Sequence, residues 1–353
     1  MKVVGSVFAQ ASFQFCGHLD EYLIKRVDDL ALFYMQTRFG KGGHCLKIYK
    51  SGKLVEERWF SSHRSILGYY FLWVWHWCWQ LWRFSRKRKN VKAIFFHPLG
   101  AFGMRFRRKV KHIFWQWDYF PSSFAVDRMF NKTAKHYADR CASYRPITGA
   151  IGRVMGFPNA QVLMLGVEKP RFYGDETSKR LLLVGQLRHG QGVEQVLEFI
   201  RDNREYSLSL IGAATYDFGE VIKSIIGNGD MAKRVYFPNR FFTDAELREE
   251  AKKCFAVLAL YDTSPDNLTH YADPGKVKSS AELGLPVVMT RISEIVPYVE
   301  RFHSGVVVDS IADIKTALAD ISDNYASYRA GVEAFAEYFQ YDKYYDERGL
   351  LEV

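Results

Sequence analysis

One stretch of the sequence, from Phe255 to Arg291, restricts the fold more than any other. It contains two short apolar runs, Ala256 to Leu260 and Pro286 to Thr290, joined by a polar loop and a helix-forming segment. Two buried strands connected by a helix make a βαβ unit, which requires a parallel sheet. Ligands of parallel sheets bind at the carboxyl ends of the strands, where helix N-termini attract phosphate. We therefore expect an anion site at the helix start, Asp273 to Lys276, with Lys276 supplying a positive charge.

The second half of this stretch, KVKSSAELGLPVVMT, also matches a known pattern. It resembles the donor-site helix and strand of GT-B glycosyltransferases, particularly the large group-1 (family 4) enzymes. The residues that match the family pattern are Pro274, Lys276, Gly284, Pro286, Val287, Val288 and Thr290. Two glutamates of the family pattern fall on Ser279 and Tyr271. The resemblance implies an α/β fold with two Rossmann-like domains that face a cleft.

The order of strands and helices from 180 to 308 resembles the GT-B donor domain throughout. The resemblance implies an N-terminal acceptor-binding, membrane-facing domain over 1–166 and a linker over 167–178. A nucleotide-sugar-binding domain would then cover 179–335, and 336–353 would form a helix that returns to the first domain. Ala160 to Gly166 is expected to be the last strand of the N-terminal domain.

The same resemblance assigns donor-binding residues. A glycine-rich turn follows the expected strand Arg180 to Gly185, and glycines let phosphate approach the backbone. The family has Arg and Lys there, whereas this chain has Gln186 and Gln191, so Arg188 and His189 become the cationic candidates. The full set of predicted donor-binding residues is Arg188, His189, Arg240, Tyr271, Asp273, Gly275, Lys276, Ser279 and Glu294. We expect no metal and no cofactor, because the sequence has no Asp-x-Asp cluster and cations with a helix dipole can offset the diphosphate charge.

Two further strands are expected at Val91 to His97 and at Lys111 to Trp117. His97 and Asp118 lie at their carboxyl ends, where this architecture places its chemistry. If the enzyme inverts the sugar's configuration, either residue would deprotonate the acceptor hydroxyl. The competing interpretation is that each is a structural residue or a helix cap. A retaining mechanism would need neither as a base.

Charge is distributed unevenly along the chain. Residues 1–150 contain 26 of the 49 basic residues but only 9 of the 39 acidic ones, and no acidic residue occurs from Arg58 to Trp117. Basic residues crowd the later part of that region, namely Arg83, Arg86, Lys87, Arg88, Lys89, Lys92, Arg105, Arg107, Arg108, Lys109 and Lys111. Such a surface fits an anionic partner. We expect an anionic membrane and no nucleic acid, because the region lacks any nucleic-acid recognition motif.

An aromatic segment, Ile66 to Phe84, precedes the first basic cluster. Three interpretations stay open: a helix buried in the first domain, an interfacial helix, and a membrane span. Its five tryptophans and its polar residues disfavour a span, because Trp and Tyr concentrate at the membrane interface. The first two interpretations are compatible if one face packs and the other is wet.

The sequence thus predicts a hexosyltransferase that moves a sugar from a nucleotide sugar to a lipid-linked or polysaccharide (glycan) acceptor. We expect a cytoplasmic protein that is peripherally associated with the inner face of the membrane. One alternative is a nucleotide-sugar epimerase. The other is a non-catalytic GT-B-like protein that binds membrane and partners.

Overall fold

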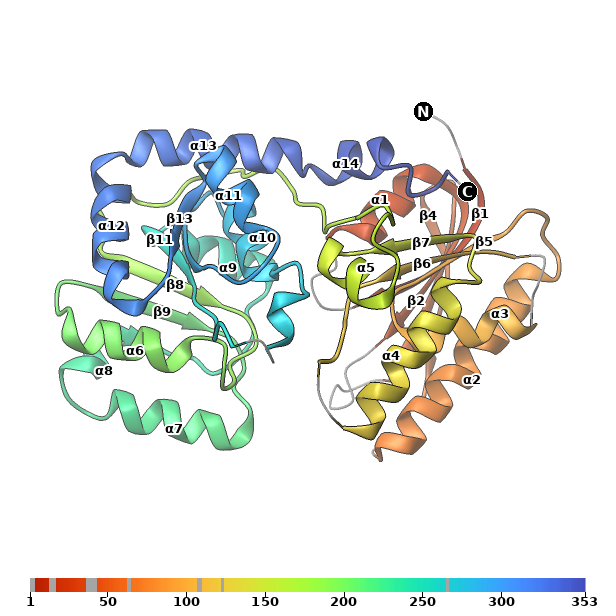
Figure 1. Ribbon diagram of the computed structural model, residues 1–353, viewed down its shortest axis with the longest axis horizontal. Coiled ribbons are helices and arrows are strands. Elements are labelled where there is room, and N and C mark those ends of the chain that lie inside the picture. Colours follow the sequence, from red (N-terminus) through yellow and green to blue (C-terminus); the bar gives the residue numbers. More distant parts are fainter. Residues whose placement is uncertain are drawn as a thin grey trace. The chain divides into compact units, whose positions relative to one another are not determined.

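The chain forms two compact units in the computed structural model, each with its own sheet (Figure 1). The structure describes residues 4–12, 17–35, 43–61, 65–106, 110–121, 124–264 and 267–352. Unit 1 consists of Met1–Gly166, Tyr271–Asp273 and Tyr341–Val353. Unit 2 consists of Val167–His270 and Pro274–Gln340.

The described part of unit 1 contains a seven-stranded sheet in the order β4-β3-β2-β1-β5-β6-β7. The outer strands β3 and β4 form an antiparallel hairpin, whereas the other strands are parallel. The strands are β1 (Val4–Ser12), β2 (Val27–Met35), β3 (His44–Lys50), β4 (Lys53–Phe60), β5 (Lys92–Phe95), β6 (Lys111–Gln116) and β7 (Ser143–Pro146). The carboxyl ends of β5, β6 and β7 therefore share one edge of the sheet, which is where His97 and Asp118 follow their strands.

Helices cover both faces of this sheet. Figure 1 shows α2 (Ile66–Ser85), α3 (Gly103–Phe106) and α4 (Ala125–Ala138) on one side, and α1 (Leu19–Arg26), α5 (Gly149–Met155) and α14 (Tyr341–Glu347) on the other. A short 3-10 helix, η1 (Pro98–Phe102), follows β5. The α2 helix is anchored by Trp77, whose ring lies 4.9 Å from that of Phe8 and 5.9 Å from that of Phe33. The aromatic segment is thus a helix with one face in the core of unit 1.

In the part of the chain that the structure describes, no helix is both long and apolar enough to cross a membrane. The α2 helix packs Trp73, Trp77 and Leu81 inward and exposes Phe71 and Trp75. The membrane-span interpretation of Ile66 to Phe84 is therefore wrong. The structure instead shows a helix with one face packed in unit 1 and the other face exposed.

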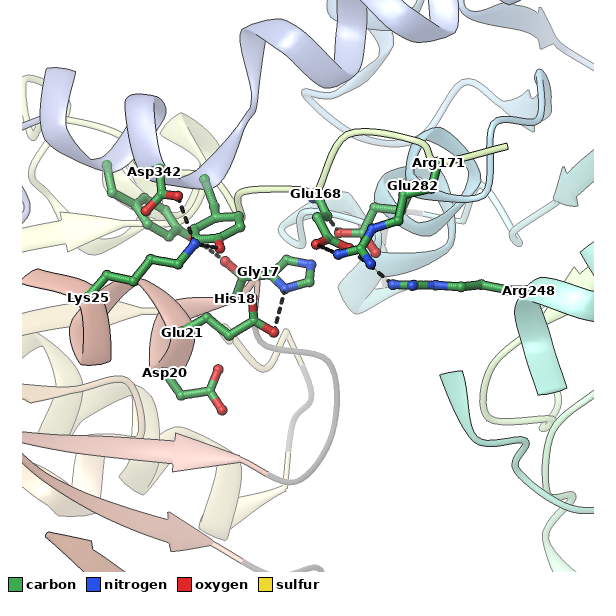
Figure 2. A network of polar contacts seen from close by, with 12 residues as sticks. Gly17, His18, Asp20, Glu21, Lys25, Glu168, Arg171, Arg248, Glu282 and Asp342 are labelled. Carbon is green, nitrogen blue, oxygen red and sulfur yellow. Dashed lines mark hydrogen bonds and ion pairs between the residues drawn. The ribbon is translucent and has the colours of Figure 1, made fainter. Parts of the chain in front are cut away.

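The last helix, α14, holds unit 1 together by polar contacts to α1 (Figure 2). Lys25 forms an ion pair of 2.9 Å with Asp342. The Tyr22 hydroxyl donates to Asp346 at 2.8 Å. His18, just before α1, pairs with Glu21 at 3.4 Å. The contacts of Lys25 and Tyr22 attach the C-terminal residues to a helix near the start of the chain.

The segment Ala160 to Gly166 does not form the predicted strand. Side chains bind its backbone N–H groups instead: the N–H of Leu165 donates to Asp273 Oδ2 at 2.7 Å, and that of Gly166 to the Tyr345 hydroxyl at 2.8 Å. The Trp115 indole N–H donates to the Leu163 carbonyl at 2.6 Å. Buried N–H groups need partners, and here side chains from distant segments supply them.

Unit 2 is a parallel sheet of six described strands in the order β10-β9-β8-β11-β12-β13. The strands are β8 (Arg180–Val184), β9 (Ser207–Ile211), β10 (Val235–Tyr236), β11 (Ala256–Ala259), β12 (Val287–Thr290) and β13 (Gly305–Val308). The helices are α6 (Val193–Asp202), α7 (Tyr216–Ile226), α8 (Asp230–Arg234), α9 (Asp244–Ala251), α10 (Gly275–Glu282), α11 (Val296–Phe302), α12 (Ile314–Asp323) and α13 (Tyr325–Tyr338). Short 3-10 helices, η2 (Leu268–His270) and η3 (Ile311–Asp313), lie in the loops before α10 and α12. The predicted strand, helix and strand of the Phe255 to Arg291 stretch are confirmed as β11, α10 and β12.

Candidate functional site

The turn between β8 and α6 passes close to the carboxyl end of β11. Gly192, which has φ +76° and caps α6, lies so near β11 that an added Cβ would sit 2.1 Å from the Leu260 carbonyl oxygen. The N–H of Asp262 donates to the Gly190 carbonyl at 3.3 Å. Glycine is therefore required at 192 by both backbone angle and space, and the turn is fixed over the end of the sheet.

Lys276 extends from the first turn of α10 into this turn. Its side chain is buried, with 8% exposed, and its Nζ donates to the Gln191 carbonyl at 3.0 Å. The same ammonium lies 4.8 Å from the centre of the Tyr261 ring. Its stem contacts Gly185, where a Cβ would lie 3.6 Å from Lys276 Cε. One lysine thus joins the ends of β8 and β11 to the start of α10.

The electrostatics of this lysine are unusual. Burial, followed by repulsion from the Arg188 charge, lowers the pKa of Lys276 to about 7. In the described surroundings the Lys276 ammonium is bound by a carbonyl and an aromatic face and forms no ion pair with a carboxylate. An anion placed between Lys276 and Arg188 would stabilise the charged form of both. The arrangement is chemically suited to bind a diphosphate.

Arg188 and His189 follow β8 and are both exposed. The Nδ1 of His189 lies 2.7 Å from Glu194 Oε1, and its ring packs 4.4 Å from that of Phe218. His189 is thus held at the first turn of α6, whereas Arg188 is exposed on the same turn. The predicted cationic pair lies on the turn that Lys276 contacts.

The remaining predicted donor residues of unit 2 have different surroundings. Gly275 is the first residue of α10, and Ser279 lies half-buried one turn later. Glu294 is half-buried shortly before α11. Arg240 is bound by Glu246, with its NH2 group 2.7 Å from Oε1, and Glu246 also completes the capping box of α9. The structure gives Arg240 a partner within unit 2 that explains its presence without a ligand.

Glu282 lies three residues after Ser279, the position of the glutamate in the family pattern, and it has a structural role (Figure 2). Its Oε1 accepts a hydrogen bond of 3.0 Å from the backbone N–H of Glu168. The Glu168 carboxylate in turn binds Arg248 at 3.0 Å and pairs with Arg171. These contacts attach the segment after Val167 to α9 and α10 and occupy the Glu282 carboxylate.

Two predicted donor residues, Tyr271 and Asp273, belong to unit 1. Asp273 is buried, and its Oδ2 holds the N–H of Leu165. The Tyr271 carbonyl accepts from the Thr148 hydroxyl at 2.7 Å, and its ring lies 4.7 Å from that of Tyr119. Within its unit, Asp273 therefore anchors backbone, and Tyr271 lies beside the segment that follows Asp118.

His97 caps the 3-10 helix η1 after β5. Its Nδ1 accepts from the N–H of Leu99 at 3.2 Å, and its ring packs against those of Tyr70, Trp73 and Phe130. Burial among these rings lowers the pKa of His97 to about 4. With Nδ1 accepting, the neutral ring carries its proton on Nε2. His97 is thus arranged to cap a helix through Nδ1 and to donate a hydrogen bond from Nε2.

Asp118 is exposed immediately after β6. Its backbone carbonyl accepts from Gln116 Nε2 at 2.9 Å, while Gln116 Oε1 accepts from the Tyr144 hydroxyl at 2.7 Å. The buried Gln116 thus positions the turn that presents Asp118 at the edge where β5, β6 and β7 end. In the described residues, no group of three or more His, Cys, Asp and Glu side chains could hold a metal ion.

Comparisons with known proteins agree with the two-unit α/β architecture. Residues 229–349 match the family described as "Glucosyltransferase 3-like, C-terminal domain". Sucrose-phosphate synthase from Thermosynechococcus elongatus is similar in structure with a TM-score of 0.70 and 11% identity, over 99% of this chain and 98% of its own. HepE from Anabaena, solved with UDP and glucose, has a TM-score of 0.66 and 12% identity, over 98% of both chains. The chain has the GT-B fold.

A further similar structure is described as trehalose-6-phosphate from E. coli bound with UDP-2-fluoro glucose. It has a TM-score of 0.67 and 9% identity, over 99% of both chains. A search of curated proteins by sequence finds no match. The expected α/β fold with two Rossmann-like domains is confirmed.

Sequence reasoning missed residues that position the GT-B strand ends. The buried Gln10 in β1 accepts from the N–H groups of Phe96 and His97, at 3.0 and 3.1 Å. Thr290 accepts from the Tyr261 N–H at 2.9 Å and donates back to the Tyr261 carbonyl at 3.1 Å. A polar residue inside an apolar strand was the available signal, because buried polar groups are present where a backbone group needs a partner.

Proposed function

We propose that this protein is a GT-B glycosyltransferase that moves a sugar from a nucleotide-sugar donor to a lipid-linked or polysaccharide acceptor at the cytoplasmic face of a membrane. The observation that carries the proposal is Lys276, a buried cation in the first turn of α10 that contacts the turn bearing Arg188. UDP-glucose is the first donor to test, because the matched domain is glucosyltransferase-like and HepE was solved with UDP and glucose.

The donor diphosphate would bind between Lys276, Arg188 and the N-terminus of α10. Pro274 at that N-terminus provides no side-chain cap, and N–H groups at a helix start are suited to bind an anion. As the glycosidic bond breaks, negative charge grows on the leaving diphosphate, and fixed cations stabilise it most at that moment. The proposal requires neither a metal nor a cofactor, because these groups offset the charge.

Asp118 is the preferred base if the reaction inverts configuration. It is exposed at the end of β6, whereas Nδ1 of His97 is occupied as a helix cap and its Nε2 carries the proton. An exposed carboxylate can accept a hydroxyl proton, and a ring protonated on Nε2 can only donate there. His97 would then contribute a hydrogen bond to the acceptor.

The decisive experiment is calorimetric titration with UDP and with UDP-glucose. Lys276→Gln removes the buried charge while keeping a side chain of similar length, and it should weaken binding at least tenfold, equivalent to about 1.4 kcal/mol. The matched control is Lys233→Gln, which changes an exposed lysine on α8 and should leave affinity unchanged.

Equal affinities in the parent and Lys276→Gln would contradict the donor site. A parent protein that binds UDP-glucose but neither transfers nor hydrolyses the sugar would instead support the non-catalytic alternative.

A further inference from the structure

The outward face of α2 is aromatic. Phe71, Trp75 and Trp79 recur every four residues and therefore lie on one side of the helix, with exposed fractions of 68%, 58% and 46%. Trp82 continues this line, and its ring stacks on Trp79 at 5.0 Å. We call these four residues the aromatic face. Contiguous exposed apolar side chains of this size mark interaction surfaces in soluble proteins.

Exposed basic residues continue from the end of this face. Arg86 places its guanidinium 4.9 Å from the centre of the Trp82 ring, and Arg83, Lys87 and Lys89 are exposed nearby in the chain. We call Arg83, Arg86, Lys87 and Lys89 the basic end. The surface is thus apolar along the helix and positively charged at its C-terminus.

Two residues of the basic segment have partners within unit 1 and are not counted in the basic end. Arg88 is bound to Asp29, with NH2 2.9 Å from Oδ1, and Lys92 donates to the Leu351 carbonyl. Arg107, Arg108 and Lys109 lie outside the described residues. The basic end therefore rests on four described side chains rather than on the whole basic segment.

The neighbouring helix α4 adds apolar side chains at its N-terminus. The two helices are adjacent in unit 1, with the rings of Tyr70 and Phe130 5.7 Å apart (Figure 1). Phe124 is 75% exposed, and Met129 is 53% exposed. Exposed apolar groups are therefore present on both helices.

We propose that the aromatic face and the basic end dock unit 1 onto an anionic lipid bilayer, with α2 lying in the plane of the interface. This inference rests on the membrane location in the proposed function and names the residues that achieve it. Tryptophan and phenylalanine side chains partition to the boundary between headgroups and acyl chains, and basic residues are attracted to anionic headgroups. Lipid is the favoured occupant because positive charge adjoins the apolar face and no acidic residue occurs from Arg58 to Trp117.

The test is flotation of the full-length protein with vesicles, without donor or acceptor. One set of vesicles contains phosphatidylcholine alone, and the other contains one third phosphatidylserine. The parent should float at least tenfold more with anionic vesicles. Phe71→Ser with Trp75→Ser should reduce that binding at least tenfold at every salt concentration. Arg86→Glu with Lys87→Glu should reduce it similarly at low salt but less at high salt, because salt screens only the electrostatic part.

Matched controls come from unit 2. Phe241→Ser removes another exposed aromatic side chain, and Arg204→Glu with Lys233→Glu reverses two exposed charges. Both controls should float like the parent. Thermal melting of every variant must match the parent, which is expected because the changed side chains are exposed.

Three results would overturn the docking surface. The first is a parent protein that does not bind anionic vesicles. The second is an equal loss of binding in the unit 2 controls. The third is sedimentation showing that the aromatic face joins two copies of the chain. UDP binding is measured separately by calorimetry, so a failure of docking is distinguishable from a failure of the proposed donor site.

Discussion

A single buried lysine connects the sequence pattern to chemistry in this protein. The position of Lys276 at a helix start was predictable, because the apolar runs around it define strand ends. Its burial and its contact with the Gln191 carbonyl were not, because they depend on how Gly185 and Gly192 bring the first turn against β11. Such close approach is set by packing between segments far apart in the sequence.

Donor binding should depend on pH through this lysine. The pKa of Lys276 is lowered to about 7 in the free protein, so its charged form, which binds the diphosphate, is lost as pH rises through 7. The association constant for UDP-glucose should be nearly constant below pH 6 and should approach a tenfold fall per pH unit above the pKa. Calorimetry between pH 6 and 8.5 measures this directly.

Lys276→Arg is the control for pH dependence, because arginine stays protonated over this range. Its affinity for UDP-glucose should not vary with pH. A flat profile for the parent would show that the lysine is already fully charged or does not contact the donor.

Transfer should depend on Asp118. Asp118→Asn preserves shape but removes the proton acceptor, so the transfer rate should fall about 100-fold while UDP-glucose affinity is retained. His97→Asn keeps a side chain able to cap η1, so it should lower the transfer rate less than Asp118→Asn does. Steady-state rates with separately measured donor affinity decide between them. Transfer by Asp118→Asn at the parent rate would rule out this base.

At the level of elements, the strands expected from apolar runs are present, but the strand expected at Ala160 to Gly166 is not. The strands of unit 2 are short apolar runs bounded by turn residues, and these were recognisable. Ala160 to Gly166 has the same composition but pairs with side chains of Asp273 and Tyr345. An apolar composition predicts that a segment is buried. It does not predict which groups form hydrogen bonds with the buried backbone.

The Tyr345 hydroxyl should therefore contribute measurably to stability. It donates to the Gly17 carbonyl at 2.7 Å and accepts from the Gly166 N–H at 2.8 Å, all in the interior. Tyr345→Phe leaves both groups without this partner and should lower the free energy of unfolding by about 1–3 kcal/mol. Tyr236→Phe, at an exposed site, is the control and should change it by less than about 0.5 kcal/mol.

Urea unfolding of the Tyr345→Phe and Tyr236→Phe variants provides the comparison. Equal stability of the two variants would mean that water replaces the Tyr345 hydroxyl without cost.

For the whole molecule, the division into two units separates proposed donor binding from proposed acceptor deprotonation and membrane docking. The Lys276 and Arg188 region belongs to unit 2, whereas Asp118, the aromatic face and α14 belong to unit 1. Because unit 1 includes Tyr341–Val353, its integrity depends on residues at the other end of the chain. The predicted linker over 167–178 and the interdomain cleft stay predictions.

Deleting 341–353 should damage unit 1 selectively. The deletion removes five buried side chains, those of Tyr341, Tyr344, Tyr345, Leu350 and Leu351. Calorimetric melting of the shortened chain should lose or lower one transition, since burying each large side chain is worth about 1.5–3 kcal/mol. UDP binding should persist, because Lys276 lies in unit 2. Loss of UDP binding together with both transitions would show that the units do not fold separately.

The attachment of α14 to α1 also sets the order in which the protein can mature on the ribosome. Synthesis proceeds at about 5–20 residues per second, so the segment after Gly166 takes roughly 10 to 40 s to emerge. During that interval the nascent N-terminal segment lacks the tyrosines that complete its core. Unit 2, whose residues end at Gln340, is translated in full before these tyrosines appear. The first part of the chain to be made is therefore the last to become complete.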